Sequence, residues 1–274
     1  MARWAALLLV SLVPAAAVAE DWHWRRGAPS DLAEERGGVG AELALGGTSG
    51  TFAASPMLGG WWLPAEHWVL SLDWGATFVR DGDATRGIAN PLLTAAYAVE
   101  TNGVRAQVGL QAAPPAARVG GDDWRQEWEA QQIAAFLRGG WNRWMWLPEM
   151  LAFAVPIHVE SLRDDVHVAM DMAFAGAVHP ADPETWQVVA QGALEGGYRD
   201  AWGAAGLRLQ LVWLANDLID DPRSLQTSLE PFLRVAIGDG YLSMRATLNL
   251  DAPFGFAGAN PTIWGLHLGA GATL

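Results

Sequence analysis

The chain of 274 residues contains no cysteine and no lysine, and after its first twenty residues it has no long hydrophobic run. The absence of cysteine excludes disulfide bonds, thiolate metal ligands and cysteine nucleophiles. No later segment reaches the roughly 18 consecutive apolar residues of a membrane-spanning helix, so no such helix is available. With 30 acidic and 17 basic residues and a formal charge of −13, the chain has no basic surface for nucleic acid.

The first 19 residues have the pattern of a secretory signal peptide. Arg3 provides a basic start, residues 4–13 are apolar, and Ala17 and Ala19 form a small-x-small cleavage site. This apolar stretch is well short of the roughly 20 residues that a retained transmembrane helix requires. We therefore expect export with cleavage after Ala19, followed by a polar lead of residues 20–36.

The rest of the chain alternates between apolar and polar positions with period two, the pattern of a strand with one apolar face. Half of the chain is hydrophobic, with 31 Gly and 16 Trp. The alternation predicts about twelve strands of roughly 9 to 13 residues, a length that suits tilted membrane spans. They are 39–46, 51–62, 67–79, 88–99, 104–112, 151–161, 166–175, 186–195, 203–214, 225–237, 241–251 and 263–274.

The links between these strands alternate in length. Short links such as Thr101-Asn102-Gly103 follow every second strand, and most of the others are longer, at 80–87, 114–150, 178–184, 216–224 and 252–262. Short periplasmic turns and long outer loops are typical of outer-membrane β-barrels. The predicted fold is therefore all-β, a transmembrane antiparallel barrel over 37–274 whose last strand pairs with its first, because lipid offers the backbone no partners. The alternative is a soluble β-sandwich, which would have to accommodate an awkward number of tryptophans.

Aromatic residues are predicted to form girdles at the two membrane interfaces. Near the short turns are Trp61, Trp62, Trp68, Tyr97, Trp202 and Tyr241, and toward the long loops are Phe78, Trp213 and Trp264.

The arrangement resembles Gram-negative outer-membrane β-barrel proteins over essentially the whole chain after the signal peptide. The resemblance implies location in the outer membrane, contact with outer-membrane lipid, and assembly by the barrel assembly machinery. Members of that class usually end on an aromatic residue, whereas this chain ends on Leu274.

A narrower likeness lies in residues 87–115, where Gly87, Asn90, Pro91, Leu93 and Tyr97 open a strand, a turn and a second strand that ends at prolines. This hairpin is similar to the corresponding hairpin of barrels related to the long-chain fatty acid and aromatic-hydrocarbon transporters. The likeness implies passive uptake of small, often apolar molecules.

Charged and polar side chains at the inward-facing positions are candidates to line the lumen. One interpretation is a hydrogen-bonded interior that seals and stabilises the barrel, and the other is a narrow polar passage that selects solutes. Because Arg234 and Arg245 flank one turn, we expect a carboxylate such as Glu230 or Glu195 to bridge them. The candidates are Glu42, Asp73, Arg105, Gln107, His158, Glu160, His167, Asp171, Glu195, Arg208, Glu230, Arg234, Arg245 and His267.

An outer-membrane hydrolase is the alternative of another class. It would need a nucleophile beside a histidine and a carboxylate. His158, Glu160, His167 and Asp171 are close across one predicted hairpin, but Ser161 has the wrong parity to join them. We therefore predict no enzymatic activity, no catalytic residue and no cofactor, and the spacing of this cluster is not diagnostic of a metal site.

The longest loop, residues 122–150, is predicted to contain a helix over about 124–138. Asp122 or Asp123 can cap its start and Gly139-Gly140 can end it. The tryptophans of this loop either anchor it at the outer membrane interface or fold with it over the barrel mouth as a lid above a solute site. They are Trp124, Trp128, Trp141, Trp144 and Trp146.

The sequence thus predicts a barrel for passive passage or capture of a small, possibly apolar solute. A structural or adhesion barrel with a sealed polar interior is the second hypothesis. The lead of residues 20–36 could lie in the periplasm or fill the lumen, and the alternation of apolar and polar residues does not distinguish these two placements.

Overall fold

The computed structural model describes residues 37–273 except 49, 82, 121–123, 164, 201, 216–224 and 252–262. The predicted signal peptide and the lead of residues 20–36 lie outside the described residues. The strands are β1 (Gly37–Gly47), β2 (Phe52–Ala65), β3 (Trp68–Asp81), β4 (Asp83–Ile88), β5 (Leu92–Thr101), β6 (Val104–Ala113), β7 (Leu151–Arg163), β8 (Val166–His179), β9 (Asp182–Asp200), β10 (Gly203–Leu214), β11 (Leu225–Ile237), β12 (Gly240–Asn249) and β13 (Trp264–Thr273).

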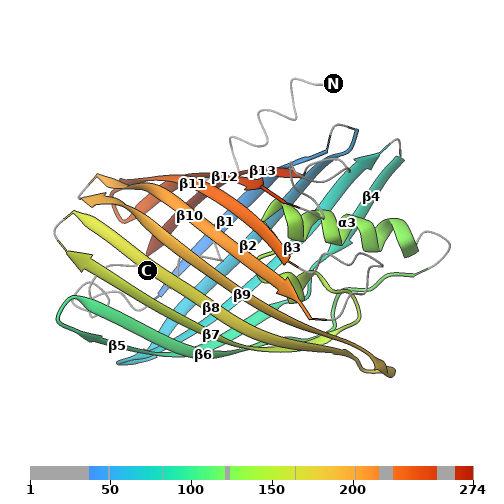
Figure 1. The fold of residues 1–274 in the computed structure, drawn as a ribbon, viewed down its shortest axis with the longest axis horizontal. Helices are drawn as coiled ribbons and strands as arrows, with labels where there is room; N and C mark the ends of the chain where they lie inside the picture. Colours follow the sequence, from blue (N-terminus) through green and yellow to red (C-terminus); the bar gives the residue numbers. More distant parts are fainter. Residues whose placement is uncertain are drawn as a thin grey trace.

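The strands form one closed antiparallel barrel (Figure 1). Strands that are neighbours in sequence pair with each other, except β4 and β5, which both pair with β3, and β13 returns to pair with β1 from Gly38 opposite Thr273 to Gly47 opposite Trp264. Closure agrees with the predicted alternation, because every second residue of each strand faces lipid while the backbone of the strand is paired. The predicted fold class and the predicted pairing of the last strand with the first are both confirmed.

One wall position is shared by two short strands. β3 pairs with β4 through Ala76–Asp81 and with β5 through Trp68–Asp73, so β4 and β5 follow each other along the same edge. Residues 89–91 interrupt them, and the barrel therefore has twelve strand positions and one extra strand. Pro91 lacks the amide hydrogen that a continuous ladder would use, which accounts for part of the break.

The prediction of a long loop at 80–87 is wrong. Asp81 lies opposite Asp83, so these residues extend the hairpin β3–β4 by further pairs. The extension lies against α3 (Trp124–Leu137), since Thr85 Oγ1 donates to Gln126 Oε1 at 3.3 Å. A local sequence pattern cannot reveal this support, because it comes from a helix that begins some forty residues later.

The long connection between β6 and β7 folds onto the barrel end and into its interior. It contains α3, as predicted, and a short 3₁₀-helix η1 (Arg143–Trp146). We call residues 124–150 the plug. Trp144, Trp146 and Leu147 are buried in one apolar cluster with Met57 and Leu92 of the wall. Figure 1 shows α3 beside β4 at the end of the barrel opposite the short turns.

No helix among the described residues combines the length and hydrophobicity needed to cross a bilayer.

Two members of the predicted aromatic girdles face inward instead. Trp61 and Tyr241 are buried, and they form a small cluster with Val69 and Ala96 at the short-turn end of the lumen. The other residues assigned to girdles have exposed side chains on the outer face. Trp61 is at one of the alternate positions of β2 that face the lumen, so its closeness to a turn did not place it at the membrane interface. The exposed ones are Trp62, Trp68, Tyr97, Trp202, Phe78, Trp213 and Trp264.

Candidate functional site

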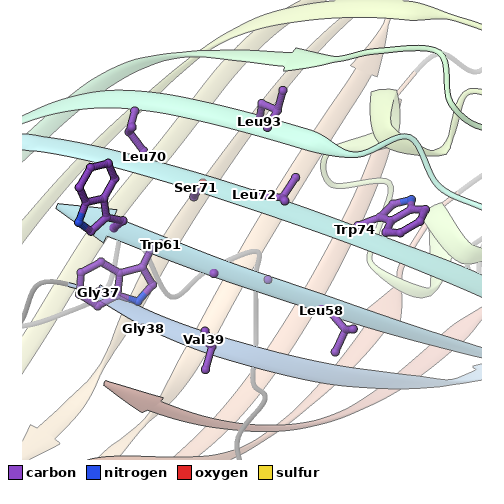
Figure 2. Close-up of a pocket in the computed structure, with 13 residues that line it drawn as sticks. Gly37, Gly38, Val39, Leu58, Trp61, Leu70, Ser71, Leu72, Trp74 and Leu93 are labelled. Atoms are coloured by element: carbon purple, nitrogen blue, oxygen red, sulfur yellow. The ribbon is translucent and has the colours of Figure 1, made fainter. Parts of the chain in front are cut away.

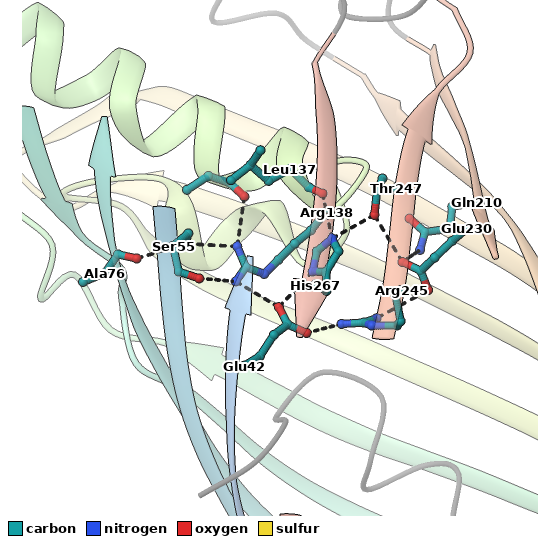
Figure 3. A network of polar contacts seen from close by, with 11 residues as sticks. Glu42, Ser55, Ala76, Leu137, Arg138, Gln210, Glu230, Arg245, Thr247 and His267 are labelled. Atoms are coloured by element: carbon teal, nitrogen blue, oxygen red, sulfur yellow. Dashed lines mark hydrogen bonds and ion pairs between the residues drawn. The ribbon is translucent and has the colours of Figure 1, made fainter. Parts of the chain in front are cut away.

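The end of α3 is fastened to the barrel wall by Arg138 (Figure 3). Its guanidinium lies 3.0 Å from Glu42 Oε1 on β1 and donates to the backbone and hydroxyl oxygens of Ser55 on β2, each at 3.1 Å. The same guanidinium lies 5.2 Å from the ring centre of Trp146 in the plug. Only 1% of the Arg138 side chain is exposed. Its charge is therefore compensated by protein groups, as a buried ion requires.

Glu42 serves three cationic or ionisable partners at once. Besides Arg138, its carboxylate contacts Arg245 on β12 and lies 3.1 Å from His267 Nδ1 on β13. Arg245 also reaches Glu230 Oε1 at 3.4 Å. The network thus spans β11, β12, β13, β1 and the plug, and one acid is its common member.

The expected contact between Glu230 and Arg245 is present, at 3.4 Å. The Arg234 guanidinium also lies over the Tyr241 ring, 3.8 Å from its centre. Tyr241 thus offers Arg234 a cation–π contact near the barrel end.

A threonine, a histidine and a glutamate in this network are spaced like a catalytic triad. Thr247 Oγ1 lies 3.0 Å from His267 Nε2, and His267 Nδ1 faces Glu42. However, the Leu137 carbonyl oxygen of the plug lies 2.9 Å from the same Nε2. A carbonyl can only accept, so Nε2 donates and cannot take a proton from Thr247. The arrangement therefore fastens the plug and does not activate a nucleophile.

A second buried cluster surrounds Glu160 on β7. Arg105 Nη1 lies 3.6 Å from one carboxylate oxygen, and His158 Nε2 and His167 Nε2 lie 3.8 Å and 3.6 Å from the other. Ser161 is opposite Val104 and Val168, on the outward face and away from the cluster. Among the described residues, no group of three or more His, Cys, Asp or Glu side chains has an arrangement that could hold a metal ion.

The cluster continues to β9, β10 and the plug. His158 Nδ1 lies 2.6 Å from Asp171 Oδ1, and Asp171 Oδ2 lies 3.2 Å from Arg208. The Arg208 guanidinium lies 4.4 Å from the ring centre of Trp141 in the plug. Glu195 Oε1 lies 3.4 Å from His167 Nδ1. Charged groups therefore face one another around much of the interior, from β6 to β1.

The structure places the sequence-predicted lumen residues on the inner face. Asp171 and Arg234 are partly buried and the others are buried. The fully inward set comprises Glu42, Asp73, Arg105, Gln107, His158, Glu160, His167, Glu195, Arg208, Glu230, Arg245 and His267.

The tryptophans of the long loop divide into two groups. Trp141, Trp144 and Trp146 are buried within the barrel, and Trp124 at the start of α3 is exposed. Trp128 is half-buried. Burial of the first three contradicts the anchor interpretation and supports the lid interpretation for this part of the loop, because an interfacial anchor would leave their rings at the lipid boundary.

Asn90, in the break between β4 and β5, holds the far end of the plug. Its Nδ2 donates to Leu147 O at 2.7 Å, its Oδ1 accepts from Ala117 N at 2.8 Å, and its backbone N donates to Met145 O at 2.7 Å. Trp74 Nε1 donates to Ala89 O at 2.8 Å and fixes the break from the outer side. At the break, Asn90 therefore forms hydrogen bonds with the plug region in place of a ladder with a neighbouring strand.

The regular hydrogen-bond ladder between β1 and β2 is the shortest of those between neighbouring strands, although the two strands lie side by side. Among the described residues, the ladder between them has one residue pair, Gly37 opposite Trp62. Pro56, Gly59 and Gly60 lie in β2, where proline cannot donate to a ladder and glycine favours irregular pairing. Backbone groups left unpaired in lipid cost several kcal/mol each, on the order of the transfer penalty for an amide.

An apolar groove of about 770 Å³ begins at this seam and extends over β3 and β5 (Figure 2). Its outer walls are exposed apolar side chains from β2, β3 and β5, among them Leu58, Leu72 and Leu93. Glycines 37, 38, 59 and 60 give its floor no side chains, and the buried Trp61 ring packs against Gly38 from within. Trp61 is therefore the side chain that backs the wall at this point.

Sequence reasoning missed two buried arginines of the plug. Arg138 and Arg143 lie near the end of the predicted helix, and Arg138 joins the plug to the wall, while Arg143 lies 5.3 Å from the ring centre of Phe136 in α3. An arginine beside the expected Gly139-Gly140 cap is ordinarily exposed. The available signal was the excess of inward-facing acids that needed cationic partners.

Comparisons with known proteins support the fold. No protein-family model and no curated protein sequence matches the chain. A solved structure described as the COG4313 outer membrane channel from Pseudomonas putida F1 is similar, with a TM-score of 0.67, 12% identity, and coverage of 94% of this chain and all of that one. The NanC porin structure has a TM-score of 0.55 and 9% identity, and covers 85% of this chain and all of that one. At these identities the likeness concerns the fold.

Proposed function

We propose that this chain, an outer-membrane β-barrel, captures a small apolar solute and lets it pass the outer membrane passively. The observation that carries the proposal is the apolar groove at the seam between β1 and β2, of about 770 Å³. That volume is typical of small-molecule sites, which are mainly apolar. The channel and porin folds to which the chain is similar agree with passage of a solute.

The interior supports an apolar solute over an ion. The lumen is lined by buried ion pairs such as Arg105–Glu160 on neighbouring strands, and the plug lies across it, held to β1 by Arg138–Glu42. An ion moving through would have to displace these pairs, whereas an apolar molecule can use the glycine-floored seam, where Trp61 separates the groove from the inner face.

The test is to cross-link the seam. In the register of Gly37 with Trp62, Val39 is opposite Gly60, and a Cβ at position 60 would lie 3.7 Å from Val39 Cγ1. Because the chain has no cysteine, Val39→Cys with Gly60→Cys gives one defined disulfide. A matched control pairs Leu242→Cys with Ala270→Cys across the regular β12–β13 ladder.

The assay follows uptake of an apolar fluorescent arylamine dye into Gram-negative cells with an intact outer membrane. The proposal predicts faster uptake with the wild-type protein than without it, slower uptake when the seam is oxidised, and recovery on reduction. The control disulfide should have no effect. Equal uptake with and without the wild-type protein would overturn the proposal. Slower uptake with both disulfides would show that the solute does not pass at the seam.

A structural or adhesion barrel is the second candidate, and the buried ion-pair networks favour it. Single-channel conductance in a planar bilayer separates the two, using wild-type protein beside a variant lacking residues 122–147. Conductance that rises on deletion supports a passage closed by the plug. Silence from both folded proteins, together with equal dye uptake, supports the sealed barrel.

A further inference from the structure

A second cavity, of about 580 Å³, lies at the plug end of the barrel, away from the seam. Trp124 and Trp128 of α3 form one side, Leu147 and Met150 contribute from the end of the plug, and His179 at the end of β8 closes another side. Leu147 and Met150 are buried members of the plug core. The cavity thus combines two aromatic rings, an aliphatic side chain and a thioether, which contacts aromatic rings favourably.

The backbone around this cavity is held by fixed contacts. Glu149 has a φ of 62°, in the left-handed region, and its N donates to Ala117 O at 2.9 Å. Its carboxylate lies 3.5 Å from His179 Nε2 and 3.9 Å from Arg118. Asn90 binds the carbonyl of Leu147 from the wall. A non-glycine residue keeps such a conformation only where its surroundings determine it, so the cavity is formed before a ligand arrives.

The charges at the rim favour a cation. The Arg125 guanidinium lies 5.7 Å from the Trp124 ring centre, so the face of this ring already accepts a positive group. The Glu149 carboxylate already contacts His179 and Arg118. Glu129, which also lines the cavity, is exposed and makes no ion pair within the described part of the chain.

We propose that this cavity binds a small aromatic amine in its ammonium form. The ring lies against Trp124 and Trp128 above Leu147 and Met150, and the ammonium group faces Glu129. The site goes beyond the proposed function, because binding here does not require passage through the barrel. An uncharged aromatic molecule would lose the carboxylate contact, and an aromatic carboxylate would be repelled by it.

Ligand-observed NMR on the full-length protein in a non-aromatic detergent tests this with three matched probes: 2-phenylethylamine, ethylbenzene and 3-phenylpropanoate. The amine is expected to bind most tightly and the carboxylate least. Glu129→Gln should weaken the amine by about two- to fivefold and leave ethylbenzene unchanged, in the range of one exposed ion pair. Trp128→Leu should weaken both. Arg125→Ala, which removes a competing cation, should strengthen the amine.

Glu66→Gln, which removes an exposed carboxylate at the short turn between β2 and β3 and does not line the cavity, is the control and should change nothing. Equal binding of amine and carboxylate, or an amine affinity that Glu129→Gln does not alter, would overturn the proposal. The protein with the oxidised 39–60 disulfide should bind the amine like wild type. Dye uptake that the oxidised disulfide does not slow, together with a retained preference for the amine, would refute the proposed function and leave this site standing. Slowed dye uptake with equal binding of amine and carboxylate would do the reverse.

Discussion

The sharing of Glu42 among Arg138, Arg245 and His267 predicts that Glu42→Gln loosens the plug far more than Arg138→Met does. Removing the carboxylate leaves buried cations without their common acid, and breaking a buried ion pair in this way costs about 3–5 kcal/mol. Arg138→Met keeps most of the apolar stem and leaves Glu42 with Arg245 and His267. Its cost is about 1–3 kcal/mol, that of unsatisfied hydrogen-bonding groups.

Trypsin measures the difference, because the chain has no lysine and Arg143 in the plug is fully buried. If plug opening is fast relative to cleavage, the rate of cutting after Arg143 reports the open fraction. Glu42→Gln should raise that rate by roughly two to three orders of magnitude and Arg138→Met by roughly one to two, at 1.4 kcal/mol per factor of ten. Cutting after the exposed Arg125 serves as the internal reference.

The double variant Glu42→Gln with Arg138→Met should cost less than the sum of the single changes, because it removes one acid and one of the cations that need it. Heat-dependent migration on gels must show that each barrel is folded. Cleavage after Arg143 that is no faster in Glu42→Gln than in wild type would refute the reasoning, as would a larger effect of Arg138→Met.

Three further changes test other parts of the molecule. Trp61→Ala should raise dye uptake by removing the ring behind the groove, while Trp62→Ala on the outer face of the same strand should not. Gly139→Ala should loosen the plug more than Gly140→Ala, measured by the same trypsin assay. Both glycines have positive φ, 67° and 79°, so alanine at either position is strained by about 1–2 kcal/mol. Only at position 139 would the added Cβ also clash, because it would lie 2.6 Å from a side-chain oxygen. Asn90→Ala should raise hydrogen exchange at residues 145–150, since it leaves buried backbone groups unpaired at about 1–3 kcal/mol, and unchanged exchange would contradict its assigned role.

The membrane barrel was predictable because a strand that faces lipid on one side must alternate, and that alternation is local. The same parity placed Glu42, Glu160 and Arg245 on the inner face before any partner was known. The helix of the long loop was also predictable, with an observed range of Trp124–Leu137, since capping and propensity act within a few residues.

Tertiary structure decided what the interior contains. Arg138 is more than 80 residues from Ser55 along the chain, and nothing near it in sequence indicates that it is buried beside Glu42. Likewise Asn90 interrupts a strand because the plug supplies hydrogen bonds in place of the ladder. Period and propensity fix which way a side chain points, but which charge meets which, and whether a loop enters the lumen, depend on packing between segments far apart in sequence.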